Sequence, residues 1–166
     1  MSINKCIELI ENSIDDATKG LPENIFLFLS RISPLINVDL LIKNSKNQTL
    51  LTWRQPGQMY GSGWHIPGGI VRYKEKIFDR INAVAESELK TKVVFEHSPL
   101  AINEVMLKQI NRGHFISLLY SCKIIQDLDT NLQFLKGTPK VGEWAWHNSC
   151  PEKLIPPHKN IYKDFI

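Results

Sequence analysis

A chain of 166 residues has the length of one ordinary domain, and it can bury a hydrophobic core without disulfides or a structural metal. Its hydrophobic content of 43% and charged content of 22% are near globular averages, which excludes a disordered or fibrous chain. The formal net charge is +3 and both signs are interleaved, so the sequence favours a small anionic ligand over a nucleic-acid partner.

The cysteines and the hydrophobic pattern bear on the cellular compartment. The three cysteines contain no Cys-x-x-Cys pair and leave an odd count, so neither a disulfide framework nor a zinc site is indicated. Acidic residues interrupt the apolar N-terminal segment, and no stretch reaches the length that spans a membrane. We therefore expect a cytoplasmic protein without a membrane partner.

Two helices are expected before the first strand. Isoleucines recur at helical spacing over residues 3–19, and a second helical run, 23–32, follows Leu21 and Pro22. We interpret residues 1–33 as an N-terminal helical extension. The apolar faces of its two helices are expected to be exposed, which suggests a homodimer contact.

The remaining elements, residues 34–166, are expected to form a single domain. An apolar, β-branched run from Leu35 to Ile42 predicts a buried strand, and a turn at 44–47 leads to a second strand, 49–54, as in a hairpin. A Pro- and Gly-rich loop, 56–63, precedes a helix at about 75–90. Further strands are expected at 93–96, 100–107, 114–125 and 143–147, and a closing helix at 158–166. This mixture predicts an α/β or α+β layered domain.

One carboxylate is out of place on the expected helix at 75–90. At about 100° per residue, the apolar side chains of this helix share one arc, and Glu88 projects within about 20° of Ile77 and Ile81. A buried carboxylate costs several kcal/mol unless donors or a cation compensate it, and the negative end of the helix dipole adds to that cost. We therefore expect a bound cation or an Arg or Lys partner beside Glu88, unless the helix ends before it.

Residues 64–91 resemble the motif of the Nudix hydrolase family. In that motif five residues separate a Gly from a Glu, and after seven more residues comes Arg-Glu, followed by a Glu pair and a Gly. Gly69 and Glu75 match its first half, and Glu88 matches an acidic position of the second half. Four further positions depart from the motif, where this chain has Ala83 for Arg, Val84 and Ser87 for Glu, and Lys90 for Gly.

The closest resemblance is to the GDP-mannose mannosyl hydrolase branch, whose motif is similarly depleted, and it covers about residues 25–125. It implies a Nudix-type α/β/α sandwich with a mixed β-sheet. It also implies a Mg²⁺-dependent hydrolase of a nucleotide sugar that releases the sugar and a nucleoside diphosphate. In that branch, the residues that match Asp39, Arg54, Glu88 and His114 belong to the active-site region.

The chemistry of the metal candidates is consistent with this implication. Mg²⁺ prefers oxygen ligands and usually keeps several waters, so the carboxylate of Glu88 and the carbonyl of Gly68 could suffice beside substrate phosphates. Glu75 could be a further carboxylate near the metal, or simply a favourable acid at a helix N-terminus.

The substrate candidates each have a structural alternative. Arg54, at a strand end, could hold a diphosphate and absorb the charge of the leaving group, or it could be a solvated arginine. Asp39 lies in an apolar run and needs a partner, either the substrate or a structural hydrogen bond. His114 could bond a substrate hydroxyl or the diphosphate, or it could be part of the surface.

The expected general base is missing. The branch has a Gln ligand and a His base shortly before its last aromatic strand, where this chain has Lys140 and Val141. Glu143 is the expected substitute, with His147 as an alternative, because a base needs reach to the water more than a fixed sequence position.

Three interpretations therefore stay open. The first is a nucleotide-sugar hydrolase. The second is a catalytically impaired Nudix-fold protein that binds a nucleotide sugar or regulates. The third is a Nudix diphosphatase that releases a nucleoside monophosphate, which the loss of carboxylates at Val84 and Ser87 disfavours.

Overall fold

The computed structural model describes residues 1–55 and 61–166. Part of the expected loop at 56–63 therefore lies outside the described residues. In chain order the elements are α1 (Ile3–Glu11), α2 (Glu23–Leu29), β1 (Leu35–Ile42), β2 (Thr49–Arg54), β3 (Gly63–His65), β4 (Gly68–Ile70), α3 (Ile77–Leu89), β5 (Val93–Phe95), β6 (Ala101–Met106), β7 (His114–Ile124), a 3₁₀ turn (Thr130–Leu132), β8 (Trp144–His147) and α4 (Pro156–Tyr162).

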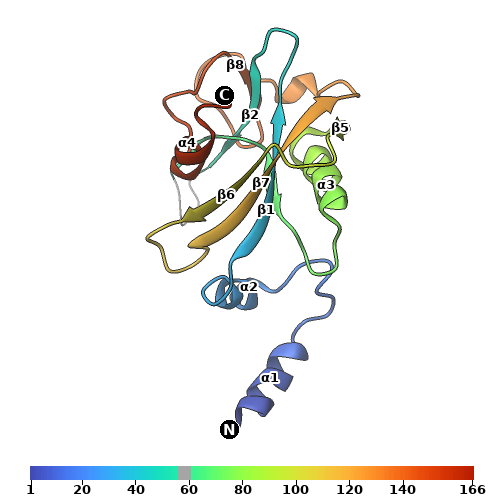
Figure 1. The fold of residues 1–166 in the computed structure, drawn as a ribbon, viewed down its shortest axis with the longest axis vertical. Coiled ribbons are helices and arrows are strands. Elements are labelled where there is room, and N and C mark those ends of the chain that lie inside the picture. Colours follow the sequence, from blue (N-terminus) through green and yellow to red (C-terminus); the bar gives the residue numbers. More distant parts are fainter. Residues whose placement is uncertain (56–60) are drawn as a thin grey trace.

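The strands form two sheets (Figure 1). In the five-stranded sheet the order is β4-β1-β7-β5, and β6 also pairs with β7. β1 and β7 are parallel, whereas the other pairs of this sheet are antiparallel, so the sheet is mixed as expected. The second sheet has the order β3-β2-β8.

The expected hairpin of β1 and β2 is wrong. The two strands meet in a bridge between Lys43 and Thr49 and then diverge into different sheets. Both strands have mostly buried side chains on both faces, so each lies inside the molecule and has partners on both edges. A simple hairpin would leave one edge of each strand unpaired.

Hydrophobic cores lie on both faces of the five-stranded sheet. Because side chains alternate along a strand, Val38 and Leu40 of β1 face α3, whereas Asp39 and Leu41 face the side of α4. The two helices lie on opposite sides of the sheet (Figure 1). The core under α3 contains Val38, Leu40, Ile42, Leu50, Ile81, Val84, Ala85, Leu89, Val93, Tyr120, Cys122 and Trp144. The core on the α4 side contains Leu41, Leu51, Trp53, Trp64, Ile66, Leu119, Leu154 and Tyr162.

Both terminal helices are placed differently from the sequence expectation. α1 ends at Glu11 instead of continuing to residue 19, because side chains beyond it bind the local backbone: the Ser13 hydroxyl donates to the Ile10 carbonyl, and Asp16 accepts from the Thr18 amide. α4 begins at Pro156 instead of residue 158, since proline is well suited to the first turn of a helix.

α1 projects from the rest of the molecule (Figure 1). No residue of α1 is buried, and α2 buries Ile25. None of the helices in the described residues has the length and apolar character needed to cross a membrane.

Candidate active site

A cavity of about 470 Å³ lies at the ends of β1 and β2, beside α3 and α4. Among its lining residues are Asp39, Arg54, Gly68 and Glu88, four of the residues expected at the site. They come from β1, β2, β4 and α3, so the fold brings together positions that are far apart in the sequence. An apolar wall beside them includes Trp53, Val105, Phe115, Val141, Ile155 and Pro157.

Asp39 is a buried carboxylate with several donors. It is 1% exposed, and it accepts hydrogen bonds from Nδ2 of Asn37 (2.9 Å), the hydroxyl of Tyr162 (2.6 Å) and the hydroxyl of Ser117. Burial raises the pKa of Asp39 to about 6, although the three hydrogen bonds act in the opposite direction. Asp39 therefore has structural hydrogen-bond partners, which are one of the two kinds of partner that the sequence left open.

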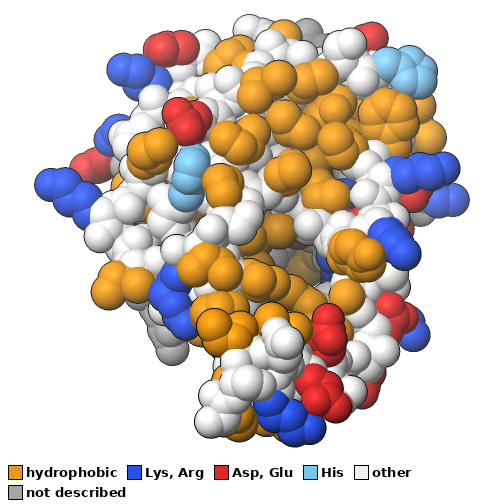
Figure 2. All heavy atoms as spheres, turned by 60° about the horizontal axis from the view of Figure 1, so that its bottom comes forward, with side chains coloured by type: hydrophobic (Ala, Val, Ile, Leu, Met, Phe, Trp, Pro, Cys, Tyr) orange, Lys and Arg blue, Asp and Glu red, His pale blue; other side chains and the backbone are white. Residues whose placement is uncertain are grey.

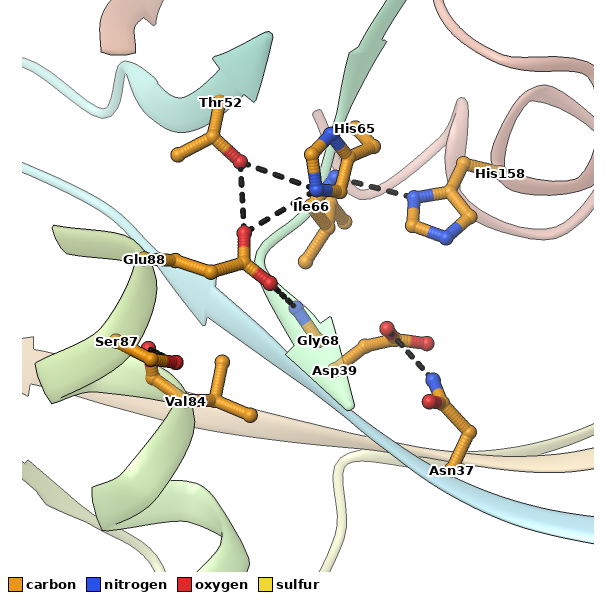
Figure 3. Close-up of polar contacts among 10 residues, drawn as sticks. All are labelled: Asn37, Asp39, Thr52, His65, Ile66, Gly68, Val84, Ser87, Glu88 and His158. Atoms are coloured by element: carbon orange, nitrogen blue, oxygen red, sulfur yellow. Dashed lines mark hydrogen bonds and ion pairs between the residues drawn. The ribbon is translucent and has the colours of Figure 1, made fainter. Parts of the chain in front are cut away.

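Glu88 lies near the end of α3 and accepts from three donors (Figure 3). Its Oε2 lies 3.0 Å from the hydroxyl of Thr52 and 3.2 Å from Nε2 of His65, and its Oε1 lies 3.2 Å from the backbone nitrogen of Gly68. The hydroxyl of Thr52 donates its hydrogen bond to Glu88. Nε2 of His65 faces the oxygen atoms of both Thr52 and Glu88, so it must be a donor. The charge is thus compensated by a histidine, a hydroxyl and an amide instead of Arg or Lys.

Gly68 separates the two carboxylates. A Cβ atom at this position would lie 2.1 Å from Oδ1 of Asp39 and 2.8 Å from the carbonyl oxygen of Val38. Only glycine therefore allows β4 to pair this closely with β1. Because its amide faces Glu88, the backbone of Gly68 lies between Asp39 and Glu88 (Figure 3).

Two histidines of the cavity wall were not singled out from the sequence. His65 pairs across the sheet with Thr52, and its Nδ1 is buried without a hydrogen-bond partner in the described part of the chain. His158 of α4 accepts the amide N–H of Ile66 on Nδ1 at 3.0 Å. Burial lowers the pKa of His158 well below its usual value, and the nearby charges of His65 and Arg54 act in the same direction.

A strand pattern could have drawn attention to His65. It stands between the buried residues Trp64 and Ile66, so alternation directs its side chain to the face opposite theirs. His158 offers no comparable local signal, because its partner, the amide of Ile66, is 92 residues away in the sequence.

Three of the expected site residues do not line the cavity. Glu75 accepts from the Arg72 amide at 2.9 Å and forms an ion pair with Arg80 at 2.8 Å. His114 pairs with Glu104 at 3.1 Å on the other face of the sheet. Glu143 accepts the backbone N–H of Lys140 at 2.8 Å. In this loop Val141 and Gly142 line the cavity.

The carboxylates do not form a complete protein cage for a metal. The described residues contain no group of three or more His, Cys, Asp or Glu that could hold a metal ion. Mg²⁺, however, commonly binds one or two carboxylates and takes its other ligands from water and phosphate. A carboxylate has about four lone-pair sites. The bonds described above use three of those of Glu88, which leaves room for a metal on Oε1.

Comparisons with known proteins give the fold. No family model matches the sequence, and no curated protein matches it. A MutT protein from Methanosarcina mazei Go1 has a similar structure, with a TM-score of 0.60 and 19% identity over 80% of this chain and 94% of that one.

Two further solved structures are similar. For a Nudix hydrolase from Nitrosomonas europaea the TM-score is 0.55 and the identity 16%, over 69% of this chain and 72% of the other. For a UDP-X diphosphatase the TM-score is 0.56 and the identity 17%, over 98% of this chain and 74% of the other. The chain therefore has a mixed α/β fold of the Nudix type, as the sequence predicted.

Proposed function

We propose that this protein is a Mg²⁺-dependent hydrolase of a nucleoside diphosphate sugar, similar to the GDP-mannose mannosyl hydrolases, which releases the sugar and the nucleoside diphosphate. The observation that carries the proposal is the convergence of Asp39, Arg54 and Glu88 on one cavity of about 470 Å³. That volume is in the range of small-molecule sites, at roughly 300–1,000 Å³. The resemblance assigns these same three positions to the active-site region.

The two kinds of polar group suit the two parts of such a substrate. Arg54 is a fixed cation on the cavity wall and is suited to the diphosphate. The carboxylate of Asp39 and the amide of Asn37 are suited to sugar hydroxyls, since both can accept hydrogen bonds. In this proposal Glu88 and the carbonyl of Gly68 would hold Mg²⁺, which would supply positive charge to stabilise the departing diphosphate.

Glu143 stays the proposed general base. It follows Val141 and Gly142, which line the cavity, and in this proposal its side chain turns from the Lys140 amide toward the cavity. It would then exchange the Lys140 amide for a water molecule. We do not include His114 and Glu75 in the proposed site, because the contact of His114 with Glu104 and the ion pair of Glu75 with Arg80 hold them outside the cavity lining.

A non-catalytic nucleotide-sugar-binding protein is the second candidate. It is favoured by Val141, an apolar residue that lines the cavity where the branch has its base. A diphosphatase is the third, and the structural likeness to a UDP-X diphosphatase over 98% of this chain supports it.

One experiment separates the three. A panel of nucleotide sugars is incubated with Mg²⁺, and the products are separated as nucleoside diphosphate, monophosphate or neither. We expect the diphosphate, with the rate abolished by a chelator and lowered roughly 100-fold in Glu88→Gln. The control is Glu86→Gln, an exposed carboxylate on the same helix. No turnover by the wild type, together with unchanged nucleotide-sugar binding in Glu88→Gln, would favour the binding protein.

We also propose a cytoplasmic homodimer. The three cysteines are free thiols, which suits a reducing compartment. Exposed hydrophobic residues occur on α1 (Ile3, Ile7, Ile10) and on the face of the sheet beyond α3 (Ile36, Ile102, Met106). Figure 2, which brings the α1 end forward, shows hydrophobic side chains gathered in a broad patch with charged side chains mainly around it. A second copy could cover both surfaces.

A further inference from the structure

The hydrogen bond between His158 of α4 and Ile66, the residue after β3, fixes the position of the proton on a cavity histidine. The backbone N–H of Ile66 can only donate, and it points at Nδ1 of His158 from 3.0 Å. Nδ1 is therefore the unprotonated nitrogen of this ring. The neutral ring must carry its proton on Nε2, so the tautomer is set by a backbone amide that cannot titrate.

The surroundings of His158 keep the ring neutral. The groups that face it are His65 of β3, whose ring centroid lies 6.1 Å away, Arg54 of β2, and Tyr162 of α4, edge-on at 5.3 Å. Arg54 and a protonated His65 would both repel a positive ring, and burial also lowers its pKa. The phenol of Tyr162 is hydrogen-bonded to Asp39 and Ser117. No carboxylate contact to stabilise an imidazolium is found in the described part of the chain.

The protonated nitrogen is available to a ligand. His158 lines the cavity, and in the close-up its second ring nitrogen points away from Ile66, on the side where Asp39 lies (Figure 3). Within residues 1–55 and 61–166, Nε2 has no hydrogen-bond partner. A donor of fixed direction therefore lies beside Arg54 and faces the ligand space.

We propose that His158 binds the ligand by donating Nε2–H to a diphosphate oxygen beside Arg54, in the tautomer that the Ile66 amide sets. The choice of diphosphate rests on the proposed function. A neutral donor adds a directed hydrogen bond without a second full charge next to Arg54. The contribution of His158 to affinity is then the same on both sides of the usual histidine pKa, and α4 belongs to the binding site.

Two substitutions distinguish the roles of Nδ1 and Nε2 of His158. In His158→Asn the side-chain oxygen can still accept from Ile66, but nothing reaches the position of Nε2. In His158→Gln the amide nitrogen can occupy the position of Nε2 and donate. The control is His97→Gln, since His97 packs against Phe78 and does not line the cavity.

Binding of inorganic pyrophosphate in the presence of Mg²⁺ is measured by calorimetry on the full chain. We expect His158→Asn to weaken binding by about 10-fold or more, equally at about pH 6 and pH 8, as for a hydrogen bond to a charged group. His158→Gln should stay within about 3-fold of wild type, like the control. Nitrogen NMR should show the Nε2–H tautomer of His158 at both pH values and a shift of that signal when pyrophosphate binds.

Several results would overturn the inference: pyrophosphate affinity unchanged in folded His158→Asn, protonation of His158 near its usual pKa, the Nδ1–H tautomer, or no binding of pyrophosphate by the wild type. The hydrolase proposal is judged separately by release of sugar. Binding through His158 without turnover of any nucleotide sugar would support the inference and contradict the hydrolase. Turnover of a nucleotide sugar together with normal pyrophosphate binding in His158→Asn would support the hydrolase and contradict the inference.

Discussion

Asp39 shows how burial and hydrogen bonding compete at a single residue. Three donors stabilise its carboxylate, yet burial has the larger effect and raises its pKa from 3.8 to about 6. The folded state therefore binds the proton more tightly than the unfolded chain does. Its contribution to stability is fully present below the unfolded pKa and is lost as the pH rises through about 6.

The raised pKa of Asp39 predicts how stability depends on pH in comparison with Asp39→Asn, whose side chain stays neutral at every pH. Between about pH 4 and pH 7, the wild type should lose roughly 2 kcal/mol of unfolding free energy relative to the variant. Urea denaturation of both proteins across this range measures the difference, in which the other titrating groups cancel. Parallel pH profiles for the two proteins would show that Asp39 keeps an ordinary pKa.

Among single residues, the sequence revealed the carboxylates of the site better than the residues that hydrogen-bond at the site. Helical spacing alone made Glu88 conspicuous, and the resemblance pointed to Asp39 and Arg54. The partners were missed because they come from distant segments: Tyr162 is 123 residues from Asp39, and His158 is 92 from Ile66. No local pattern encodes such contacts, which depend on how α4 packs against the sheet.

At the scale of elements, the bounds of β1 and β2 agree with the sequence expectation, because each strand is an apolar run next to a turn. Their pairing was not predictable in this way. β1 pairs in parallel with β7, some 80 residues later, and a strand's own sequence carries little information about a partner so far along the chain. The early end of α1 likewise depends on individual side chains, not on periodicity.

The end of α3 carries a backbone strain that can be tested. Lys90 caps the helix in the left-handed conformation, with φ 53° and ψ 37°, at the position where the Nudix motif has Gly. A side chain in this conformation costs about 1–2 kcal/mol, which glycine avoids, although glycine also makes the unfolded chain more flexible. We expect Lys90→Gly to raise the unfolding free energy by about 0.5–1 kcal/mol in urea denaturation.

The matched control for Lys90→Gly is Lys92→Gly. Lys92 is also exposed but is not among the residues with positive φ, so glycine there should lower stability. If both substitutions destabilise the protein to the same degree, Lys90 is not strained.

The docking of α4 depends on a buried hydroxyl. Tyr162 is fully buried, and its hydroxyl binds Asp39 at 2.6 Å and Ser117 at 2.9 Å. Tyr162→Phe keeps the ring but leaves Asp39 with one donor fewer, which should lower the unfolding free energy by about 1–3 kcal/mol. Tyr73→Phe, at a side chain that is 61% exposed, should change it little. Equal effects of the two substitutions, measured by urea denaturation, would show that the hydroxyl does not anchor α4.

For the whole molecule, the exposed faces of α1 and the sheet bear on the proposed homodimer. α1 has nine residues and buries none of them. Isolated helices shorter than about 12–15 residues are marginal in water, so α1 needs a covering surface to remain helical. In the proposed homodimer a second copy would supply this surface, since the sheet face beyond α3 exposes Ile36, Ile102 and Met106.

Association and the helicity of α1 should therefore be lost together. Removing residues 1–20 should reduce the mass in solution from dimer to monomer, as measured by size-exclusion chromatography with light scattering. Ile7→Asp on the apolar face of α1 should have the same effect, whereas Lys5→Gln, also on α1, should leave the mass unchanged. A monomeric full-length chain, or a dimer that survives the truncation, would contradict a contact through α1. Dilution of the full chain below the dissociation constant should also reduce the circular-dichroism signal of helix, because α1 then loses the surface that stabilises it.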